Sequence, residues 1–465
     1  MIDGLKLELK DAGPIVSADI DINRINIVGG PNATGKSTAS KLLYCFLKIN
    51  SSDRDRLVSR RLNRLLRDID MTFKFYSNDE DVDIDELKHH IRKMRHLLRS
   101  QDYDDFEEII DLFYKTQPLF SEAIENCKFY RVSTGEIEIS DMGVRLIREF
   151  NKVERILKSV VDGSSYFYKE VMKDLLSTEL DINGIDDKSA KNSDFYMNYA
   201  CFSDSPKSNF SFEVKPNDTG NELESEGKFN ISNVFYIESF SIFDKFNPFS
   251  STETFHTKDL KDNLFLINPI SRSFDDESIK KLEEIVDKVI GGRILKDKRG
   301  ELYFASNDSN YTSSMKNTAS GIKQIAVIQT LLHNRFLGEE CVLIMDEPEV
   351  NLHPEWQIKL ARILVLLAKE GNITLYINTH SPMLIEAIDT FCEYYDFEEY
   401  VNYYLSRKLG DDEIKTEEDK TKAKFERIPS DELYIIYENL GDPFDYLDQV
   451  RLSKGRKEGF DDLDF

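Results

Sequence analysis

Residues 25–38, with the sequence INIVGGPNATGKST, decide the fold of this chain of 465 residues. Ile25–Val28 is a short apolar run, which is typical of a buried strand, and a glycine-rich turn follows it. From Lys36 to Lys48 the apolar residues recur with helical spacing. A strand, a glycine-rich turn and a helix in this order indicate an α/β protein.

The turn fits the pattern G-x-x-x-x-G-K-[ST], in which backbone N–H groups and a helix N-terminus surround phosphate groups. A lysine at this spacing reaches the terminal phosphates, and the next hydroxyl is placed to bind Mg²⁺. The alternative is a glycine turn that only caps a helix, and the preceding strand argues against it. The residues expected to bind the nucleotide are Gly30, Pro31, Asn32, Ala33, Thr34, Gly35, Lys36, Ser37 and Thr38.

A second motif, CVLIMDEP at residues 341–348, reads as a buried parallel strand that ends in two acids. Ligands of α/β sheets lie at the carboxyl ends of the strands, so we expect Asp346, together with Ser37, to hold Mg²⁺. Glu347 is placed to deprotonate the attacking water. Two acids could instead cap the helix expected at 355–370, but Pro354 already supplies a start for that helix.

His380 lies in NTHSP, residues 378–382, directly after the next expected strand. A single histidine is more often structural than functional. At this sheet edge, however, we expect its side chain to contact the γ-phosphate or the attacking water. Ser320 and Gly321 begin an expected helix at 321–336, whose N-terminus could hold another anion. Any serine N-cap looks like this, so the interpretation depends on the order of the motifs.

In that order, the motifs resemble the ABC-type ATPases of the RecF and SMC branch. They most closely resemble the stand-alone ATPases allied to overcoming-lysogenisation-defect proteins, many of which serve anti-phage defence. The resemblance covers residues 1–50 and 195–390, and Glu349–Pro354 match the family's D-loop. It implies an α/β head, in which a mixed β lobe adjoins a parallel P-loop core, with a helical insertion.

The resemblance also implies a head-to-head homodimer, or a higher homo-oligomer, with ATP and Mg²⁺ at the seam. Lys36, Glu347 and His380 would be catalytic, and Ser320, Gly321 and Asn351 would contact nucleotide, the first two from the opposite head. The sequence departs from the family pattern at Ile322, where a glycine is usual, and it lacks a clear Q-loop glutamine. Glu238 or Ser239 stands roughly in that location.

The sequence pattern along the chain predicts a division into three regions. Residues 1–50 and 195–390 form the head, 51–194 form a helical insertion or arm, and 391–465 form a strand–helix extension with an acidic tail. The tail after His380 is shorter than the nuclease domain that relatives often append, so we expect no nuclease domain. Hydrolysis would then act as a switch that controls a separate effector, a nuclease or toxin encoded nearby.

The composition limits the kinds of partner that the protein can be expected to bind. The net charge of −25 argues against nucleic-acid binding over the whole surface, so any such contact would be local. The sequence shows no apolar run long enough to span a membrane, no signal peptide, and scattered cysteines that read as reduced thiols, so we expect a cytoplasmic location.

The insertion carries concentrated positive charge, which leaves two interpretations open. One is a surface for DNA, RNA or protein, as in a RecF-like repair ATPase, and the other is a solvated helix face that pairs with the abundant acids. A transporter-type energy subunit fits poorly with so large an insertion. The arginines concerned are Arg54, Arg60, Arg61, Arg64 and Arg67.

Overall fold

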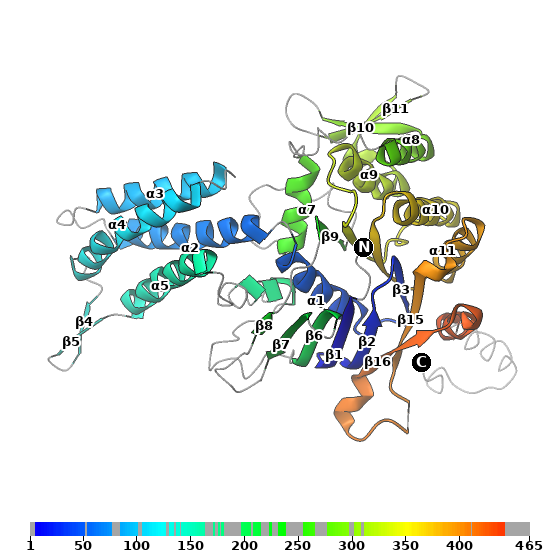
Figure 1. The fold of residues 1–465 in the computed structure, drawn as a ribbon, viewed down its shortest axis with the longest axis horizontal. Coiled ribbons are helices and arrows are strands. Elements are labelled where there is room, and N and C mark those ends of the chain that lie inside the picture. Colours follow the sequence, from blue (N-terminus) through cyan, green and yellow to red (C-terminus); the bar gives the residue numbers. More distant parts are fainter. Residues whose placement is uncertain are drawn as a thin grey trace, which may run out of the picture. The chain divides into compact units, whose positions relative to one another are not determined.

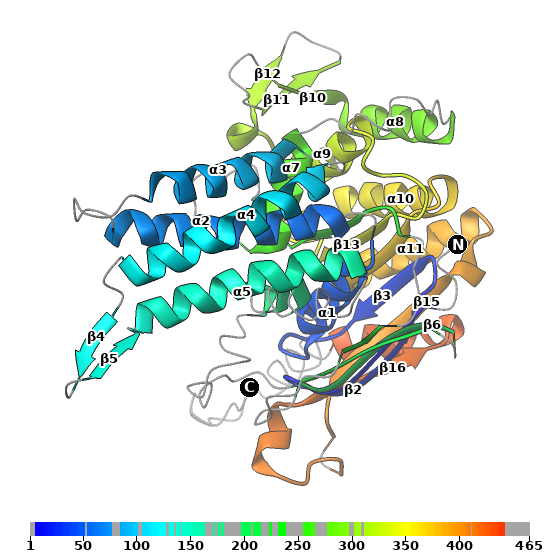
Figure 2. The same cartoon turned by 60° about the vertical axis from the view of Figure 1, so that its left-hand side comes forward.

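The computed structural model describes most of the chain. The described residues are 5–51, 54–76, 84–100, 105–126, 130–133, 136–139, 141–162, 171–172, 175–176, 178–180, 197–205, 208–214, 223–225, 231–238, 254–265, 277–296, 302–307, 311–410 and 412–441. The chain forms two compact units (Figures 1 and 2). Unit 1 combines Met1–Leu47 with Ser177–Phe465, and unit 2 is Lys48–Leu176.

Unit 1 is built on an 11-stranded sheet. Five neighbouring strands run parallel in the order β9, β13, β14, β3 and β15. Three of them, β3, β13 and β14, are buried along their whole length, as expected for strands covered on both faces. The five strands are β3 (Ile25–Gly29), β9 (Val234–Ile237), β13 (Val342–Asp346), β14 (Thr374–Thr379) and β15 (Val401–Lys408).

The sheet continues beyond β15 as a mixed lobe in the order β16, β2, β1, β6, β7 and β8. Only the pair of β16 and β2 is parallel there, and the other neighbours are antiparallel. This arrangement confirms the predicted α/β class with a mixed β lobe and a parallel core. The strands are β1 (Lys6–Ala12), β2 (Ile15–Asp21), β6 (Met197–Ser205), β7 (Ser208–Val214), β8 (Leu223–Ser225) and β16 (Ala423–Ile428).

Helices and a small second sheet complete the described part of unit 1. Helix α10 begins with Pro354 at its first turn, and the His353 side chain caps it, so the proline acts as the predicted start signal. The helices are α1 (Lys36–Ile49), α7 (Phe255–Phe265), α8 (Glu277–Ile290), α9 (Ser320–His333), α10 (Pro354–Glu370) and α11 (Pro382–Tyr394). Strands β10 (Gly292–Lys296), β11 (Leu302–Ser306) and β12 (Thr312–Ser314) form the small sheet, and short 3₁₀ turns lie at Met315–Asn317, Glu398–Tyr400, Glu417–Thr421 and Ser430–Glu432.

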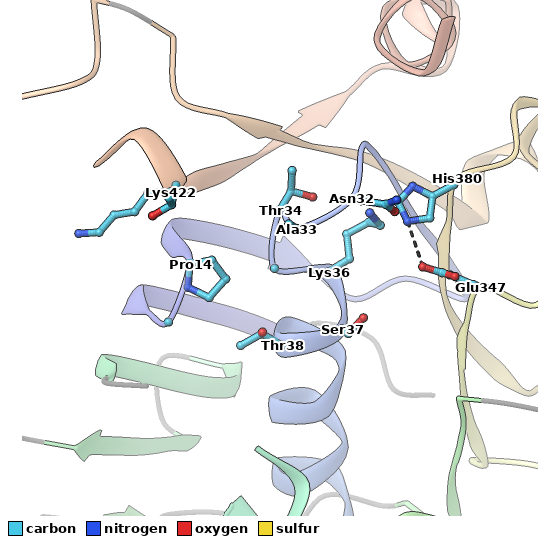
Figure 3. Close-up of a pocket in the computed structure, with 13 residues that line it drawn as sticks. Pro14, Asn32, Ala33, Thr34, Lys36, Ser37, Thr38, Glu347, His380 and Lys422 are labelled. Carbon is cyan, nitrogen blue, oxygen red and sulfur yellow. Dashed lines mark ion pairs between the residues drawn. The ribbon is translucent and has the colours of Figure 1, made fainter. Parts of the chain in front are cut away.

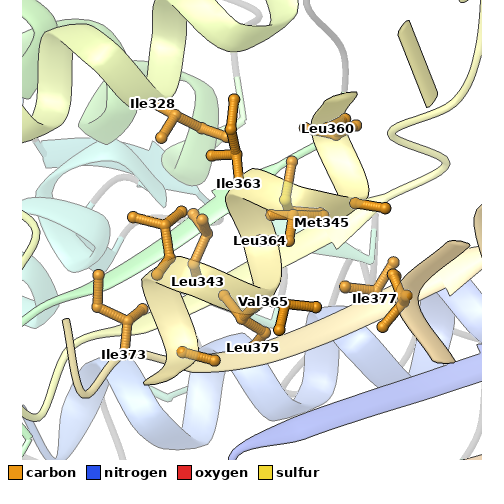
Figure 4. Close-up of a cluster of buried hydrophobic side chains, with 14 of the residues drawn as sticks. Ile328, Leu343, Met345, Leu360, Ile363, Leu364, Val365, Ile373, Leu375 and Ile377 are labelled. Carbon is orange, nitrogen blue, oxygen red and sulfur yellow. The ribbon is translucent and has the colours of Figure 1, made fainter. Parts of the chain in front are cut away.

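The main core lies where α10 crosses β13 and β14, with α9 beside it (Figure 4). Leu364 of α10 is fully buried, as are Leu343 and Leu375 on the strands beneath it. Burying each such side chain contributes about 1.5–3 kcal/mol, so this contact holds the strand ends in register. The labelled side chains of Figure 4 are Ile328, Leu343, Met345, Leu360, Ile363, Leu364, Val365, Ile373, Leu375 and Ile377.

The opposite face of the parallel core meets α1. Side chains alternate between the two faces of a strand, so Phe235 and Ile237 join the main core whereas Tyr236 points the other way. The Tyr236 ring packs edge-on against Tyr44 of α1, with ring centroids 5.8 Å apart. The helix that follows the P-loop is therefore fixed against the far side of the sheet.

In the described part of unit 2, helices α2, α3, α4 and α5 lie side by side, and β4 and β5 form a two-stranded hairpin (Figure 2). Its interior includes stacked aromatic rings, since Phe120 and Phe150 lie with their centroids 3.9 Å apart. The predicted helical insertion at residues 51–194 is thus helical in these described segments, and the hairpin was not anticipated. The elements are α2 (Arg54–Tyr76), α3 (Asp85–Ser100), α4 (Asp105–Asn126), β4 (Tyr130–Ser133), β5 (Glu136–Ile139) and α5 (Asp141–Asp162).

One strand of unit 1, β16, was not predicted from the sequence. The sequence predicts a charged loop over residues 409–425, but the structure begins strand β16 at Ala423. Ala423, Phe425 and Ile428 are buried between charged residues, so the strand is amphipathic and its charges hide the pattern. Residues 434–441 are helical, as the sequence predicts.

Candidate functional site

The P-loop, Gly30–Ser37, joins the end of β3 to the start of α1. Gly30, Ala33 and Gly35 all have positive φ, which bends the backbone into a tight loop. A Cβ on Gly30 would lie 2.1 Å from the carbonyl oxygen of Ser406, and one on Gly35 would lie 2.5 Å from Ile15 Cγ1. The two glycines are therefore required both by their φ angles and by close neighbours on β15 and β2.

Lys36 is buried in this loop, with 5% of its surface exposed. Its Nζ donates to the carbonyl oxygens of Gly30 at 2.9 Å and Pro31 at 2.7 Å. Burial lowers the pKa of Lys36 to about 8, although the nearby carboxylates of Asp346 and Glu347 act in the opposite direction. The ammonium group of Lys36 is thus held at the backbone of the P-loop, where it can pair with an oxygen of a bound phosphate group.

Asp346 ends β13 and is held from two sides. Its Oδ2 accepts from the Tyr236 hydroxyl at 3.2 Å, and its Oδ1 accepts from Nδ2 of Asn378 at 2.7 Å. Asn378 also donates to Ser40 Oγ at 2.9 Å, which ties the aspartate to α1 one helical turn after Ser37. Each carboxylate oxygen keeps a free lone pair.

The oxygen donors of Asp346 and Ser37 suit Mg²⁺, which takes one or two protein oxygens and completes its octahedron with phosphate oxygens and water. Among the described residues no group of three or more histidine, cysteine, aspartate or glutamate side chains could hold a metal by itself. A metal here would therefore depend on the phosphate groups of a bound nucleotide.

Glu347 and His380 contact each other at the same sheet edge. Nε2 of His380 lies 3.0 Å from Oε1 of Glu347, and Figure 3 shows both side chains beside Lys36. Burial and the Lys36 charge lower the pKa of His380, even though Glu347 opposes the change. Glu347 has φ of 49°, a strained value for a residue with a side chain, and strain of this kind gathers at functional sites.

Residues 32–38 of the P-loop and the start of α1 line one pocket of about 580 Å³ together with Glu347 and His380 (Figure 3). Four more lining residues come from outside the predicted set: Gly13 and Pro14 at the turn between β1 and β2, and Thr421 and Lys422 before β16. The sequence signalled Gly13–Pro14 only as a turn. No sequence signal marks Lys422, because it lies in the segment that the sequence predicts to be a charged loop.

Residues 6–385 match the family AAA_15, described as an AAA ATPase domain. The chain belongs to this family. Solved structures with similarity include an Smc head bound to the C-winged helix domain of ScpA, with a TM-score of 0.39 and 11% identity over 91% of this chain and 96% of that chain.

Two further similar structures are SMC head domains. The one from Thermotoga maritima has a TM-score of 0.33 and 9% identity, and covers 91% of this chain and 98% of that chain. The one from Pyrococcus yayanosii, which includes a coiled coil and joint, has a TM-score of 0.33 and 9% identity over 93% of this chain and 98% of that chain.

Other predicted residues of this AAA ATPase domain lie apart from the pocket lining. The predicted residues that are not among its lining residues are Gly30, Pro31, Ser320, Gly321, Asp346 and Asn351. Gly321, in the first turn of α9, lies under the ring of Trp356, and a Cβ there would be 2.7 Å from Trp356 Cδ2. Gln324 of α9 donates to the carbonyl of Val350 at 2.7 Å, so the start of α9 is fixed to the D-loop.

Glu349, which the sequence placed in the D-loop, is buried behind His380. Its Oε1 accepts from Thr379 Oγ1 and from the backbone N–H of His380, both at 2.7 Å. Burial raises the pKa of Glu349 despite these hydrogen bonds. The carboxyl group therefore positions the loop that carries His380, a role that the motif spacing did not reveal.

Glu238, one of the two Q-loop candidates, follows β9. It pairs with Lys41 of α1 at 2.8 Å and with Nε2 of His256 at 3.2 Å. The other ring nitrogen of the buried His256, Nδ1, contacts Glu179. Ser239, the second candidate, lies outside the described residues.

Several positive residues of unit 2 have acidic neighbours. Arg95 of α3 contacts Asp70 at 3.2 Å, and Lys93 contacts Glu108 at 2.8 Å. Arg67 contacts Asp68 at 3.5 Å. The side chain of Arg54 lies outside the described residues. In the described parts of the chain, no helix has the length and apolar character that a membrane span needs.

Proposed function

We propose that this AAA ATPase domain binds ATP with Mg²⁺ in the pocket at the P-loop and hydrolyses it. The observation that carries the proposal is the meeting of the P-loop, Lys36 and the Glu347–His380 pair in one pocket. Phosphoryl transfer needs a cradle for the phosphates, a cation at the terminal phosphates and a group that orients water. The residues that lie at the carboxyl ends of the parallel strands β3, β13 and β14 provide all three.

Each residue has a distinct role in the proposed reaction. Backbone N–H groups of the P-loop and the start of α1 hold the phosphates, and Lys36 neutralises charge near the γ-phosphate. Asp346 and Ser37 hold Mg²⁺, which when bound neutralises charge on the phosphate oxygens. Glu347 accepts a proton from the attacking water, and His380 donates a hydrogen bond to the γ-phosphate side of the pocket.

We further propose that two chains meet head to head, so that the start of α9 from one chain faces the P-loop of the other. Support comes from the position of Ser320 and Gly321, which do not line the pocket of their own chain. A helix N-terminus carries partial positive charge, and it would complete the cage around the γ-phosphate. The closed dimer, or a higher homo-oligomer built on it, would depend on bound ATP.

Nucleotide binding is tested by measuring ATP affinity and turnover of the Lys36→Ala variant. Loss of both is expected, because a buried cation at the phosphates is removed. Lys10→Ala is the matched control, since Lys10 lies on β1 and its exposed ammonium pairs with Glu8. Unchanged ATP affinity in Lys36→Ala would contradict the proposed site.

Completion of the site by a second chain is tested by mixing two inactive variants. Ser320→Arg blocks the α9 tip, and Lys36→Ala blocks the P-loop. In a mixed dimer one composite site keeps both native residues, so turnover is expected to return on mixing. If each chain used its own α9, the mixture would stay inactive.

For the cellular role we propose an ATP-dependent switch that controls a partner effector, a nuclease or toxin, in anti-phage defence. The support is the motif order of the sequence, which resembles stand-alone defence ATPases. Co-expression with the product of a neighbouring gene tests it, and an ATP-dependent complex or ATP-dependent effector activity is expected.

The alternative is a RecF-like ATPase that binds DNA through the arginine-rich helix α2 of unit 2. It predicts salt-dependent DNA affinity that falls when Arg60, Arg61 and Arg64 become glutamate. The acidic neighbours of Arg67, Lys93 and Arg95 in unit 2 and the overall charge of −25 favour the switch. DNA affinity that is absent, or unchanged in the triple variant, would remove the alternative.

A further inference from the structure

The pocket has two ends that differ in chemistry. Glu347 and His380 form one end, and Figure 3 shows Lys422 beyond the P-loop on the side away from them. Pro14, at the turn between β1 and β2, lies on that second side as well. Among the residues that line the pocket, the lysines are Lys36 and Lys422. The second end therefore carries a positive charge of its own.

Lys422 is fixed at this end by the backbone on both sides. The N–H of the following residue, Ala423, donates to the carbonyl of Pro14 at 2.8 Å. The carbonyl of Lys422 accepts from the N–H of Leu409 at 3.1 Å. These bonds join the segment before β16 to the end of β15 and to the β1–β2 turn. The position of the lysine is thus set by the sheet and not by a free loop.

The same hairpin, formed by β15 and β16, also contacts the P-loop. Thr34 Oγ1 lies 2.6 Å from Ser406 Oγ of β15, and both hydroxyl groups are buried. Residues of this hairpin fall outside the family match, which ends at residue 385. The nucleotide pocket therefore includes a part of the chain that the AAA ATPase domain match does not cover.

Charges near the hairpin distinguish Lys422 from its neighbours. Lys424 pairs with Glu413 and with Glu426 and is directed into that acidic network. Lys422 has an ion pair outside this network, 3.6 Å from its Nζ to Oδ1 of Asp419.

The direction of a bound triphosphate follows from the first end of the pocket. The γ-phosphate must face Glu347 and His380, and the P-loop holds the phosphates behind it. The remainder of the nucleotide then emerges on the far side of the loop, toward Pro14 and Lys422. Resting on the proposed function, we infer that Lys422 binds the nucleoside 5′-monophosphate part of the nucleotide, through its α-phosphate and ribose oxygens.

The test compares three ligands that share different parts of ATP. Dissociation constants for ATP, ADP and inorganic tripolyphosphate, each with Mg²⁺, are measured for the full chain and for Lys422→Met, which keeps the length of the stem. ATP and ADP are expected to bind roughly tenfold more weakly, as for loss of a charge-assisted hydrogen bond. Tripolyphosphate, which lacks the nucleoside, is expected to bind as before.

Matched variants separate this effect from a general one. Lys420→Met removes an exposed lysine from the same segment and is expected to change none of the three constants. Lys422→Arg is expected to restore most of the ATP affinity. An equal loss for tripolyphosphate, or no loss for ATP and ADP, would overturn the inference. Failure of the unmodified chain to bind ATP would instead overturn the proposed function, and this inference with it.

Discussion

Nε2 of His380 lies 3.0 Å from Oε1 of Glu347, although the two residues belong to different strand–helix units. The sheet register sets this distance. Strands β13 and β14 are paired so that Asp346 is opposite Asn378, and the N–H of Glu347 donates to the carbonyl of Asn378 at 2.9 Å. The two side chains therefore emerge together, and the His380 imidazole, with its lowered pKa, tends to be neutral beside the carboxylate.

Glu347→Gln is expected to bind ATP with affinity close to that of the unmodified chain but to hydrolyse it about 10²–10⁴-fold more slowly, the usual contribution of a general base. The amide keeps the size of the side chain and cannot accept a proton. Single-turnover hydrolysis and nucleotide affinity are the measurements. Size-exclusion chromatography with ATP should also show more dimer in this variant. Equal turnover in the two proteins would contradict the assignment of the base.

Glu349→Gln is expected to retain most of the turnover, whereas Glu349→Ala should lose roughly tenfold in kcat with little change in KM. The amide oxygen of glutamine can still accept from Thr379 and from the backbone of His380, and alanine cannot. Burial raises the pKa of Glu349, so a neutral replacement suits the site. Steady-state kinetics distinguish the variants.

Glu355→Ala is the matched control for Glu349, because Glu355 is exposed and pairs with Lys359 of its own helix. It should leave both kcat and KM unchanged. Equal losses in Glu349→Gln and Glu349→Ala would mean that the charge, and not the hydrogen-bonding geometry, matters.

The structure shows which features a sequence can reveal. Local patterns sufficed for the strand–turn–helix of the P-loop and for β13 and β14, because each is a continuous apolar run with a polar end. They also placed Glu347 and His380 at one sheet edge, since parallel strands end together. Their chemical roles, and those of Ser320 and Asn351, stay predictions.

Contacts between distant segments could not be predicted in this way. Thr34 meets Ser406 across 372 positions, and Lys422 reaches the pocket through a strand whose charges hide its alternation. Nothing in the local sequence of Glu179 indicates that it pairs with His256. Such pairs depend on which strands become neighbours in the folded sheet, and one sequence carries no direct signal of that choice.

Gly321→Ala is expected to destabilise the chain by about 1–3 kcal/mol, the usual cost of overpacking. The new methyl group would lie 2.7 Å from Trp356 Cδ2, and ring or helix must move. In the double variant with Trp356→Leu the clash is relieved, so its cost should be less than the sum of the single costs. Urea unfolding measures the three free energies. Strict additivity would show that the ring does not constrain the start of α9.

Stability should depend on pH through the buried pair of His256 and Glu179 and the neighbouring Glu238. Burial alone would lower the pKa of His256, but the hydrogen bonds with the two glutamates outweigh it and raise the pKa. Its contribution to stability is then full below the unfolded value near 6.5 and is lost as the pH rises through the folded pKa.

For Glu238 the sign is opposite. The hydrogen bond with His256, aided by Lys41, lowers the pKa of Glu238 to about 2. Its contribution is present above the unfolded value near 4.5 and is lost only as the pH falls toward 2. Both contributions are full between about pH 4.5 and 6.5, so this cluster should stabilise the head most in that window.

His256→Gln should therefore lower the free energy of unfolding by about 3 kcal/mol at pH 5.5, since a buried glutamate loses its charged partner. The difference from the unmodified chain should shrink as the pH rises through the raised pKa of His256, where the native histidine loses its proton. Thermal melts from pH 5 to 9 measure this trend. His96→Gln, at an exposed position of α3, is the control and should follow the unmodified chain throughout. A difference that stays constant with pH would show that His256 contributes by packing alone, through its contacts with Tyr44 and Tyr236.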